Sequence, residues 1–249
     1  MHFISAVSCL ALFVGSCSAL STQPKVVAPL GPDKDSYEED GDLDTESLLS
    51  KSTFPIMPDD LIALAKETVF VKGTGTKDGG ECLADDFVFR AAFVEVPKDE
   101  FMKALETFSL EDSFDLKQQM FGWSVDPTQP NRVWFMNRQE GTHVKNFMGV
   151  KPTGKHLILP PQNLHIDFNE QGQVIEFGFY TVDRAQGNTG GLGGAFAFFY
   201  GVGRPLPFPE GKPYKYSFRR SMVEGLIGLL KMLPAKKSTK EEQTTVPSL

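Results

Sequence analysis

Cysteine is scarce in this sequence, and N-glycosylation signals are absent. Two of the three cysteines, Cys9 and Cys17, lie in an apolar run near the N-terminus, and Cys82 alone remains beyond it. A lone cysteine excludes an internal disulfide, and the scattered histidines offer no zinc-ligand spacing. No Asn-x-Ser/Thr triplet occurs. Freely secreted domains usually have disulfides or glycosylation sites, so these absences favour another compartment.

Net positive charge and the short motifs of several enzyme classes are also missing. The formal net charge of −7 argues against nucleic-acid binding. No serine lies in a G-x-S-x-G elbow. The glycine-rich stretch 187–211 does not form a phosphate-binding strand-to-helix motif, and its small and aromatic residues predict packing over an open end of the domain. We therefore expect no metal and no cofactor.

The N-terminal run, "ISAVSCLALFVG", has the length of a signal-peptide core and is too short to span a membrane. Small residues suited to cleavage end at Ala19, so residues 1–19 are predicted to be a signal peptide. Residues 20–54 follow as a transit-like and then acidic, disordered leader, with eight acids against Lys34 between Asp33 and Glu46. This order favours import into a plastid bounded by extra membranes, and the endoplasmic reticulum or secretion is the alternative.

The remaining sequence predicts one domain at 55–233 and a disordered tail at 234–249. Two helices come first: one over 57–73, capped by Asp59 or Asp60, and one over 97–108, with Pro97 in its first turn. The stretch "CLADDFVFRAAFVEV" between them predicts a turn of helix and a short extended piece. Long strands follow, with "NLHIDF" pairing with "VIEFGFY". Helices followed by an antiparallel sheet predict an α+β fold with the helices on one face.

The strand "VIEFGFYTVD" raises a question about its acidic end. With a period of two, Phe177, Phe179 and Asp183 share one face, which the phenylalanines mark as the interior. A carboxylate there is costly unless it is paired, hydrogen-bonded or used. Asp183 is therefore either a catalytic group in a pocket or a cap of the turn "DRAQGN", and the sequence leaves both open.

A second strand, "RVWFMNRQEGTH", repeats this change from apolar to polar residues. The same counting places Phe135, Asn137 and His143 on one face, and Trp123 of "FGWSV" adds an aromatic wall. Such a cup suits a flat apolar molecule with carbonyl or hydroxyl groups. A carboxylate in it can remove a proton next to a carbonyl while a histidine steadies the oxyanion. In the strand "NLHIDF", His165 lies on the face opposite Leu164 and Ile166 and is predicted to lie at the surface.

These stretches also resemble a known family. "LADDFVFRAAFV", "PKDEFMKAL", "RVWFMNRQEGTHVKNFMGVKPTGKHLILP" and "HIDFNEQGQVIEFGFYTVD", which run from about Leu83 to Asp183, are similar to SnoaL-like polyketide cyclases of the NTF2-like superfamily. The resemblance implies a cone-shaped α+β barrel around a central pocket. Family cyclases close a ring by an intramolecular aldol reaction without metal or cofactor. The resemblance assigns their general acid/base to Asp183 and, through "GTH", a role to His143. The long glycine-rich segment after Arg184 departs from the family pattern.

Three hypotheses remain. The first is a cyclase or isomerase with Asp183 and His143 as catalytic residues and with Asn137, Phe135, Trp123, Phe177 and Phe179 binding the substrate. The second is a non-catalytic protein that binds a lipid, pigment or terpenoid. The third is an assembly protein, a possible homodimer, whose sheet presents Trp134, Met136 and Tyr180 on its outer face.

Overall fold

The computed structural model describes residues 41–91, 94–207, 209–213, 215, 218, 220, 222–223 and 225–227. The chain divides into two units, Met1–Pro213 and Tyr214–Leu249, and the fold below is that of the first. The predicted signal peptide, most of the leader and the predicted tail lie outside the described residues. Among those residues, none of the helices is long and apolar enough to cross a membrane.

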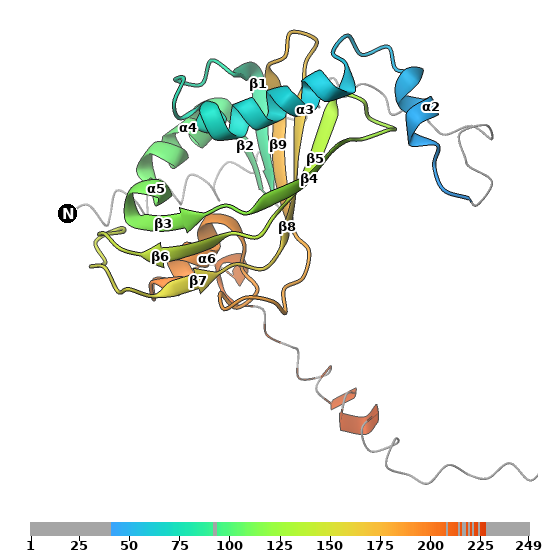
Figure 1. The fold of residues 1–249 in the computed structure, drawn as a ribbon. Coiled ribbons are helices and arrows are strands. Elements are labelled where there is room, and N and C mark those ends of the chain that lie inside the picture. The colour runs from blue at the N-terminus through green and yellow to red at the C-terminus, as the bar shows by residue number, and fades with distance from the viewer. Residues whose placement is uncertain are drawn as a thin grey trace, which may run out of the picture. The chain divides into compact units, whose positions relative to one another are not determined.

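A curved sheet of six strands organises this unit (Figure 1). Its order is β2 (Val94–Pro97), β1 (Leu83–Ala91), β9 (Val174–Thr181), β8 (Gln162–Phe168), β5 (Arg132–Asn137) and β4 (Met120–Val125). The predicted hairpin of β8 and β9 is confirmed, and every neighbouring pair is antiparallel except β1 and β9. The predicted helical turn at the start of β1 is wrong. A register shift between Leu83 and Val88 breaks the period-two pattern there, so the sequence shows no alternation.

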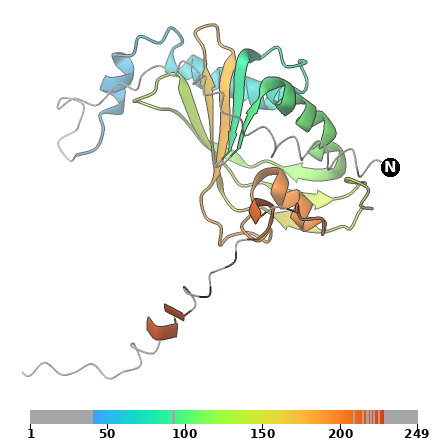
Figure 2. The same cartoon turned by 180° about the vertical axis from the view of Figure 1, so that it is seen from behind.

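A second sheet of three strands lies beside the first, in the order β3 (Phe114–Lys117), β6 (Glu140–His143) and β7 (His156–Ile158) (Figure 2). Two strands that the sequence predicts as continuous are each divided between the sheets. One breaks at 118–119, between β3 and β4, and the other at 138–139, between β5 and β6. Counting by twos across a break no longer tells which face a side chain occupies.

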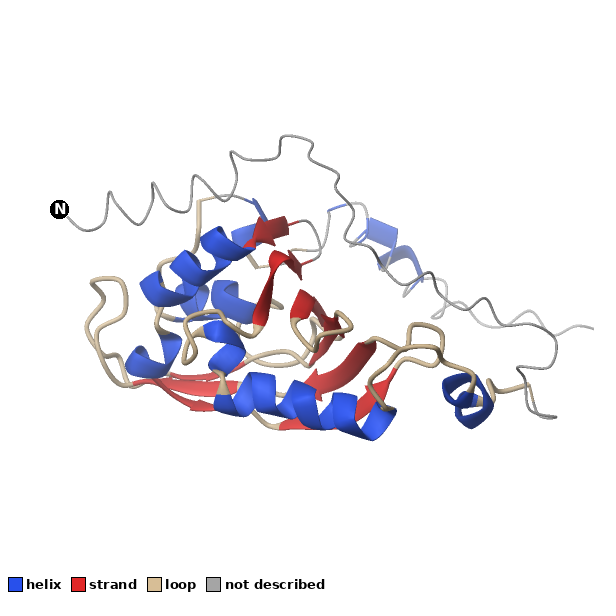
Figure 3. Cartoon of the chain, turned by 90° about the horizontal axis from the view of Figure 1, so that it is seen from above, coloured by secondary structure: helices blue, strands red, loops and turns tan. Residues whose placement is uncertain are grey.

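The longer helices pack on one face of the six-stranded sheet (Figures 1 and 3). They are α3 (Pro58–Lys66), which continues as the π-helix η2 (Glu67–Val71), and α4 (Lys98–Thr107). The predicted aspartate cap of α3 is wrong: Met57 is the N-cap, and Asp59 and Asp60 lie in the first turn, where their charges favour the helix dipole. The short elements are α2 (Thr45–Ser50), η3 (Gly73–Gly75), α5 (Leu110–Ser113) and η4 (Pro209–Gly211). Helix α2 lies in the predicted leader and buries Leu48.

The apolar core consists of two clusters. In the first, Leu61 of α3 and Phe101 of α4 pack against Val133 and Ile166 of the sheet. We call this helix-covered side of the six-stranded sheet the inner face. In the second cluster, α6 (Gly194–Gly201) packs on the three-stranded sheet through Phe198. The prediction that the glycine-rich segment packs against the domain is therefore confirmed.

Candidate functional site

The aromatic residues predicted to bind a substrate lie together on the inner face. The rings of Trp123 and Phe135 stack with centroids 4.0 Å apart and an angle of 8° between their planes. Phe177 and Phe179 both contact Phe89, with centroids 6.0 and 5.9 Å away. Period two therefore placed Phe135, Phe177 and Phe179 correctly within their strands, and Trp123 joins them although the register of β4 shifts beside it. The rings form two aromatic groups on the inner face.

Two amides lie next to each other at the polar end of the inner face. Asn137 is the cross-strand partner of Gln162, which pairs in turn with Thr181. Asn137 and Gln162 are buried, and neither Asn137 Oδ1 nor Gln162 Nε2 has a hydrogen-bond partner among the described residues. Sequence reasoning singled out Asn137 but missed Gln162. We call these two residues the amide pair, which offers a buried acceptor and a buried donor side by side.

The glycine-rich segment covers the amide pair at Gly193. A Cβ atom on this residue would lie 2.4 Å from Gln162 Nε2 and 2.6 Å from Thr181 Oγ1. Only glycine fits here without moving those side chains. The glycine-rich segment therefore closes this end of the inner face.

A groove opens between η2 and β3. Its volume is about 520 Å³. Its lining residues come from η2, α5, β3 and the segments after η3, β3 and β6: Val69, Phe70, Lys77, Glu111, Asp112, Phe114, Asp115, Leu116, Gln118, Val144 and Lys145. The ring of Phe70 lies 6.0 Å from that of Trp123, which stacks on Phe135. Three neighbouring aromatic rings, those of Phe70, Trp123 and Phe135, therefore connect the groove with the inner face, and we call this series the aromatic path.

His143 lies behind the wall of this groove, in the three-stranded sheet. Its ring is fully buried and stacks on Phe114, whose centroid is 4.9 Å away. The backbone N–H of Thr153 donates to Nδ1 over 3.2 Å, and the hydroxyl of the same residue lies 3.1 Å from that nitrogen. Burial lowers the pKa of His143, which keeps the imidazole neutral near pH 7. The break between β5 and β6 explains why this histidine does not share the sheet of Asn137.

Asp183 lies in the turn that follows β9. Its Oδ1 accepts a hydrogen bond from the backbone N–H of Ala185, and its Oδ2 accepts one from the side chain of Gln186, both over 2.9 Å. These two hydrogen bonds lower the pKa of Asp183 below its usual value. The contacts are those of the turn-capping alternative, and the described residues include no contact between Asp183 and His143.

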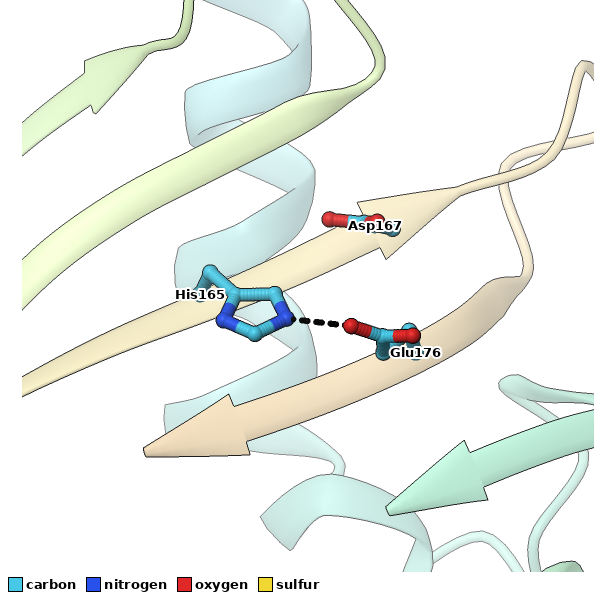
Figure 4. A group of neighbouring side chains, drawn as sticks. All are labelled: His165, Asp167 and Glu176. Atoms are coloured by element: carbon cyan, nitrogen blue, oxygen red, sulfur yellow. Dashed lines mark hydrogen bonds and ion pairs between the residues drawn. The ribbon is translucent and has the colours of Figure 1, made fainter. Parts of the chain in front are cut away.

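A buried ion network that the sequence did not predict occupies the opposite, outer face of the six-stranded sheet (Figure 4). His165 is fully buried, against expectation, and its Nε2 lies 2.8 Å from Oε1 of Glu176. Arg132 forms a fork with Asp167, with distances of 2.6 and 2.7 Å, and Arg90 reaches Glu176 over 3.1 Å. We call these five residues the ion network. Charged partners on neighbouring strands provide the hydrogen bonds that make their burial possible.

His165, Asp167 and Glu176 offer ligand atoms that all lie within 4.8 Å of one another, which is close enough for a metal ion. The carboxylate oxygens, however, already accept hydrogen bonds from guanidinium groups or from His165. Arg90 and Arg132 balance the charges of the two carboxylates, so a divalent cation would meet two fixed positive charges. The donor set therefore does not fit a metal ion.

The pKa values of the two carboxyl groups move in opposite directions. Burial raises the pKa of Asp167, against the opposing effect of Arg132. Burial would also raise the pKa of Glu176, but the hydrogen bond with His165 and the charge of Arg90 bring it below its usual value. Glu176 has charged or hydrogen-bonded partners on three strands, and this keeps it ionised.

Among the comparisons with known proteins, the search of solved structures alone finds proteins similar to this chain. No protein-family model matches the chain, and no curated protein matches it. AclR of Streptomyces galilaeus, a proposed hydroxylase, is 20% identical over 70% of this chain and 95% of its own, with a TM-score of 0.42. A proposed SnoaL-like polyketide cyclase from Jannaschia sp. CCS1 is 20% identical over 52% of this chain and 88% of its own, with a TM-score of 0.39.

An epoxide hydrolase of the LEH-like type from M. tuberculosis is 8% identical over 50% of this chain and 84% of its own, with a TM-score of 0.38. Two of the similar structures are named as SnoaL-like polyketide cyclases, the family that the sequence resembles, and others are named as polyketide cyclases. At these identities and TM-scores they say nothing of this chain's activity. The predicted fold class is confirmed by the α+β architecture, with its curved, largely antiparallel sheet and helices packed on one face.

Proposed function

We propose that this domain binds a small hydrophobic molecule with carbonyl or hydroxyl groups in the groove between η2 and β3. The groove carries the proposal, because its volume of about 520 Å³ lies within the roughly 300–1,000 Å³ of small-molecule sites. Val69, Phe70 and Leu116 offer apolar walls, while Lys77 and Lys145 offer donors to a ligand oxygen. Five of the eleven lining residues are apolar and six are polar or charged, so the groove suits a molecule that has both an apolar body and polar groups.

The aromatic path supports a flat ligand. Phe70 is half exposed in the groove, and the stacked pair of Trp123 and Phe135 lies behind it. A ring system in the groove would stack on Phe70 and bury its exposed surface.

Acid/base catalysis by a cyclase or isomerase is the second candidate, and the carboxylates of the groove favour it. Glu111, Asp112 and Asp115 line the groove together with apolar side chains. A carboxylate beside an apolar wall can remove a proton next to a bound carbonyl. The roles predicted for Asp183 and His143 in this chemistry remain predictions.

Nile red, an uncharged polycycle with a carbonyl group, tests the location of binding. We expect its fluorescence to rise when it binds the folded chain, and Phe70→Ala to weaken binding about fivefold or more through lost stacking and contact area. Phe121 is the matched control, since it is a half-exposed phenylalanine outside the groove lining. If Phe121→Ala weakens binding as much as Phe70→Ala does, the groove is not the site.

A ligand recovered with the chain from its own cells would separate the two candidates. Native mass spectrometry of the purified chain gives the mass of the bound molecule, and incubation with that molecule shows whether it is converted. An unchanged ligand supports a binding protein. Turnover that Asp115→Asn abolishes while binding persists supports a base in the groove. The same result for Asp183→Asn supports the base predicted from the family resemblance.

A further inference from the structure

A segment near the C-terminus, residues 212–237, differs from the rest of the chain in its charge. Between residues 212 and 237 the sequence has seven basic residues and one acid, Glu224, although the whole chain has a net charge of −7. The basic residues are Lys212, Lys215, Arg219, Arg220, Lys231, Lys236 and Lys237. This segment therefore carries six net positive charges in an otherwise acidic protein.

The same segment exposes large apolar side chains. Phe218, Met222 and Leu226 are 79, 60 and 57% exposed, and Val223 and Ile227 are about half exposed. The described residues between 218 and 227 are helical, and a spacing of four places Phe218, Met222 and Leu226 on one side of the helix. The sequence continues the pattern after the described residues with Leu229, Leu230 and Leu233. Within the described residues, this is the densest run of exposed large apolar side chains.

We propose that residues 212–237 form a cationic amphipathic segment that docks the chain on an anionic lipid surface. Such a surface satisfies both features at once, because apolar side chains enter the boundary of the acyl chains while lysines and arginines meet the headgroups. The apolar pattern covers residues 218–233, which is shorter than the roughly 20 residues of a spanning helix. The segment lies on the surface of the membrane and does not cross it.

Other anionic or apolar occupants match one feature and fail the other. A nucleic acid would neutralise the charges and leave the apolar side chains in water. The acidic stretch 33–46 of the same chain would do likewise, because eight of its fourteen residues are acids. A second copy of the segment would cover the apolar side but bring six positive charges against six.

Vesicle flotation of the full chain tests the proposal. The vesicles are phosphatidylcholine alone, or phosphatidylcholine with one-third phosphatidylglycerol. We expect binding to depend on the anionic lipid and to weaken in high salt. Met222→Glu with Leu226→Glu should lower the bound fraction at least about tenfold, because burial of two large apolar side chains is lost. Neutralising Lys231, Lys236 and Lys237 to glutamine should lower affinity roughly fivefold for each charge.

Met57→Glu with Val182→Glu is the matched control. Both residues are large, apolar and about 60% exposed in the first unit, and the pair adds the same two negative charges as Met222→Glu with Leu226→Glu. We expect this control to bind anionic vesicles within about twofold of the unaltered chain. The apolar run near the N-terminus can contact any lipid, so the readout is the difference between anionic and neutral vesicles.

Three outcomes would overturn the proposal. The first is equal binding to neutral and anionic vesicles that no tail variant alters. The second is anionic binding that survives Met222→Glu with Leu226→Glu and is lost only when the lysines are neutralised, since charge alone then acts. The third is a dimer in sedimentation that Met222→Glu with Leu226→Glu dissociates, without vesicle binding, because the apolar side then covers a second copy. None of these outcomes depends on ligand binding in the groove.

Discussion

Replacing Arg132 with methionine tests whether the ion network is a buried and mutually compensating set of charges. The guanidinium is the bidentate partner of Asp167 and lies 3.4 Å from Glu176, and both carboxylates are 5% exposed or less. Removing one partner of a buried pair costs about 3–5 kcal/mol, because the other charge is left without compensation. Methionine retains an unbranched apolar stem, but it also loses the guanidinium that lies over Trp134, 5.2 Å from the ring centroid. We expect the free energy of unfolding to fall by about that amount.

Two further variants separate the cost of leaving one buried charge unpaired from the attraction between the two charges of an ion pair. Arg132→Met combined with Asp167→Leu removes both partners of the fork, and we expect it to recover most of the loss, since apolar pairs replace buried ion pairs with little cost. Lys72→Met is the control for a surface pair, because Lys72 lies 3.0 Å from Glu67 with both side chains partly exposed. That substitution should cost less than about 1 kcal/mol. Urea unfolding followed by tryptophan fluorescence at pH 7 gives all three values.

The pH dependence of the free energy of unfolding gives an independent check on the burial of Asp167. Burial already raises the pKa of Asp167, and without Arg132 it should rise further. A carboxyl group whose pKa is higher in the folded state binds more protons there, so its protonation favours folding as the pH falls. The deficit of Arg132→Met should therefore narrow between pH 7 and pH 4. The reasoning is refuted if the single variant costs less than about 1 kcal/mol, or if the double variant is no more stable than the single one.

Three more predictions concern burial and close packing. In the chain with Cys9→Ser and Cys17→Ser, Cys82 should not react with Ellman's reagent at pH 8 until the protein unfolds, because burial raises its pKa to about 12. Gly178→Ala should cost about 1–3 kcal/mol in urea unfolding, since its Cβ would lie 2.3 Å from His165 Cε1; no measurable cost would mean that the ring moves freely. Phe198→Ala should cost about 3–5 kcal/mol if α6 belongs to the folded domain, and a cost near zero would place α6 outside it.

The inner face could be predicted from the sequence because each of its strands has one apolar side. Phe135 and Phe179 alternate with polar or small residues, and period two assigns them to the interior wherever the strand is unbroken. The method does not extend beyond the breaks. His143 follows the change of sheet at 138–139, and Asp183 follows the end of β9, so counting from the strand no longer fixes the face of either side chain.

The ion network could not be predicted by the same reasoning. Period two tells which side chains share a face, and it correctly groups His165 with Asp167 on the side opposite Ile166. It does not tell whether that face is covered. The burial of the network depends on partners from three other strands. Arg132 of β5 and Glu176 of β9 come from the two strands that flank β8, and Arg90 comes from β1, on the far side of β9. A charged outer face therefore looked like a solvated one in the sequence.

This network changes the argument for a homodimer. The aromatic side chains Trp134 and Tyr180, predicted to lie on the outer face, favoured an assembly surface, but both have intramolecular partners there. The rings of Trp134 and Tyr180 lie 5.0 and 5.8 Å from that of His165, and the indole N–H of Trp134 donates to Asp126 over 2.9 Å. The two rings flank His165 and help to exclude water from its hydrogen bond with Glu176, which strengthens that bond. The contacts within one chain therefore explain why aromatic residues occur on this face, without a second copy of the chain. Evidence for a dimer must come from the mass of the protein measured in solution.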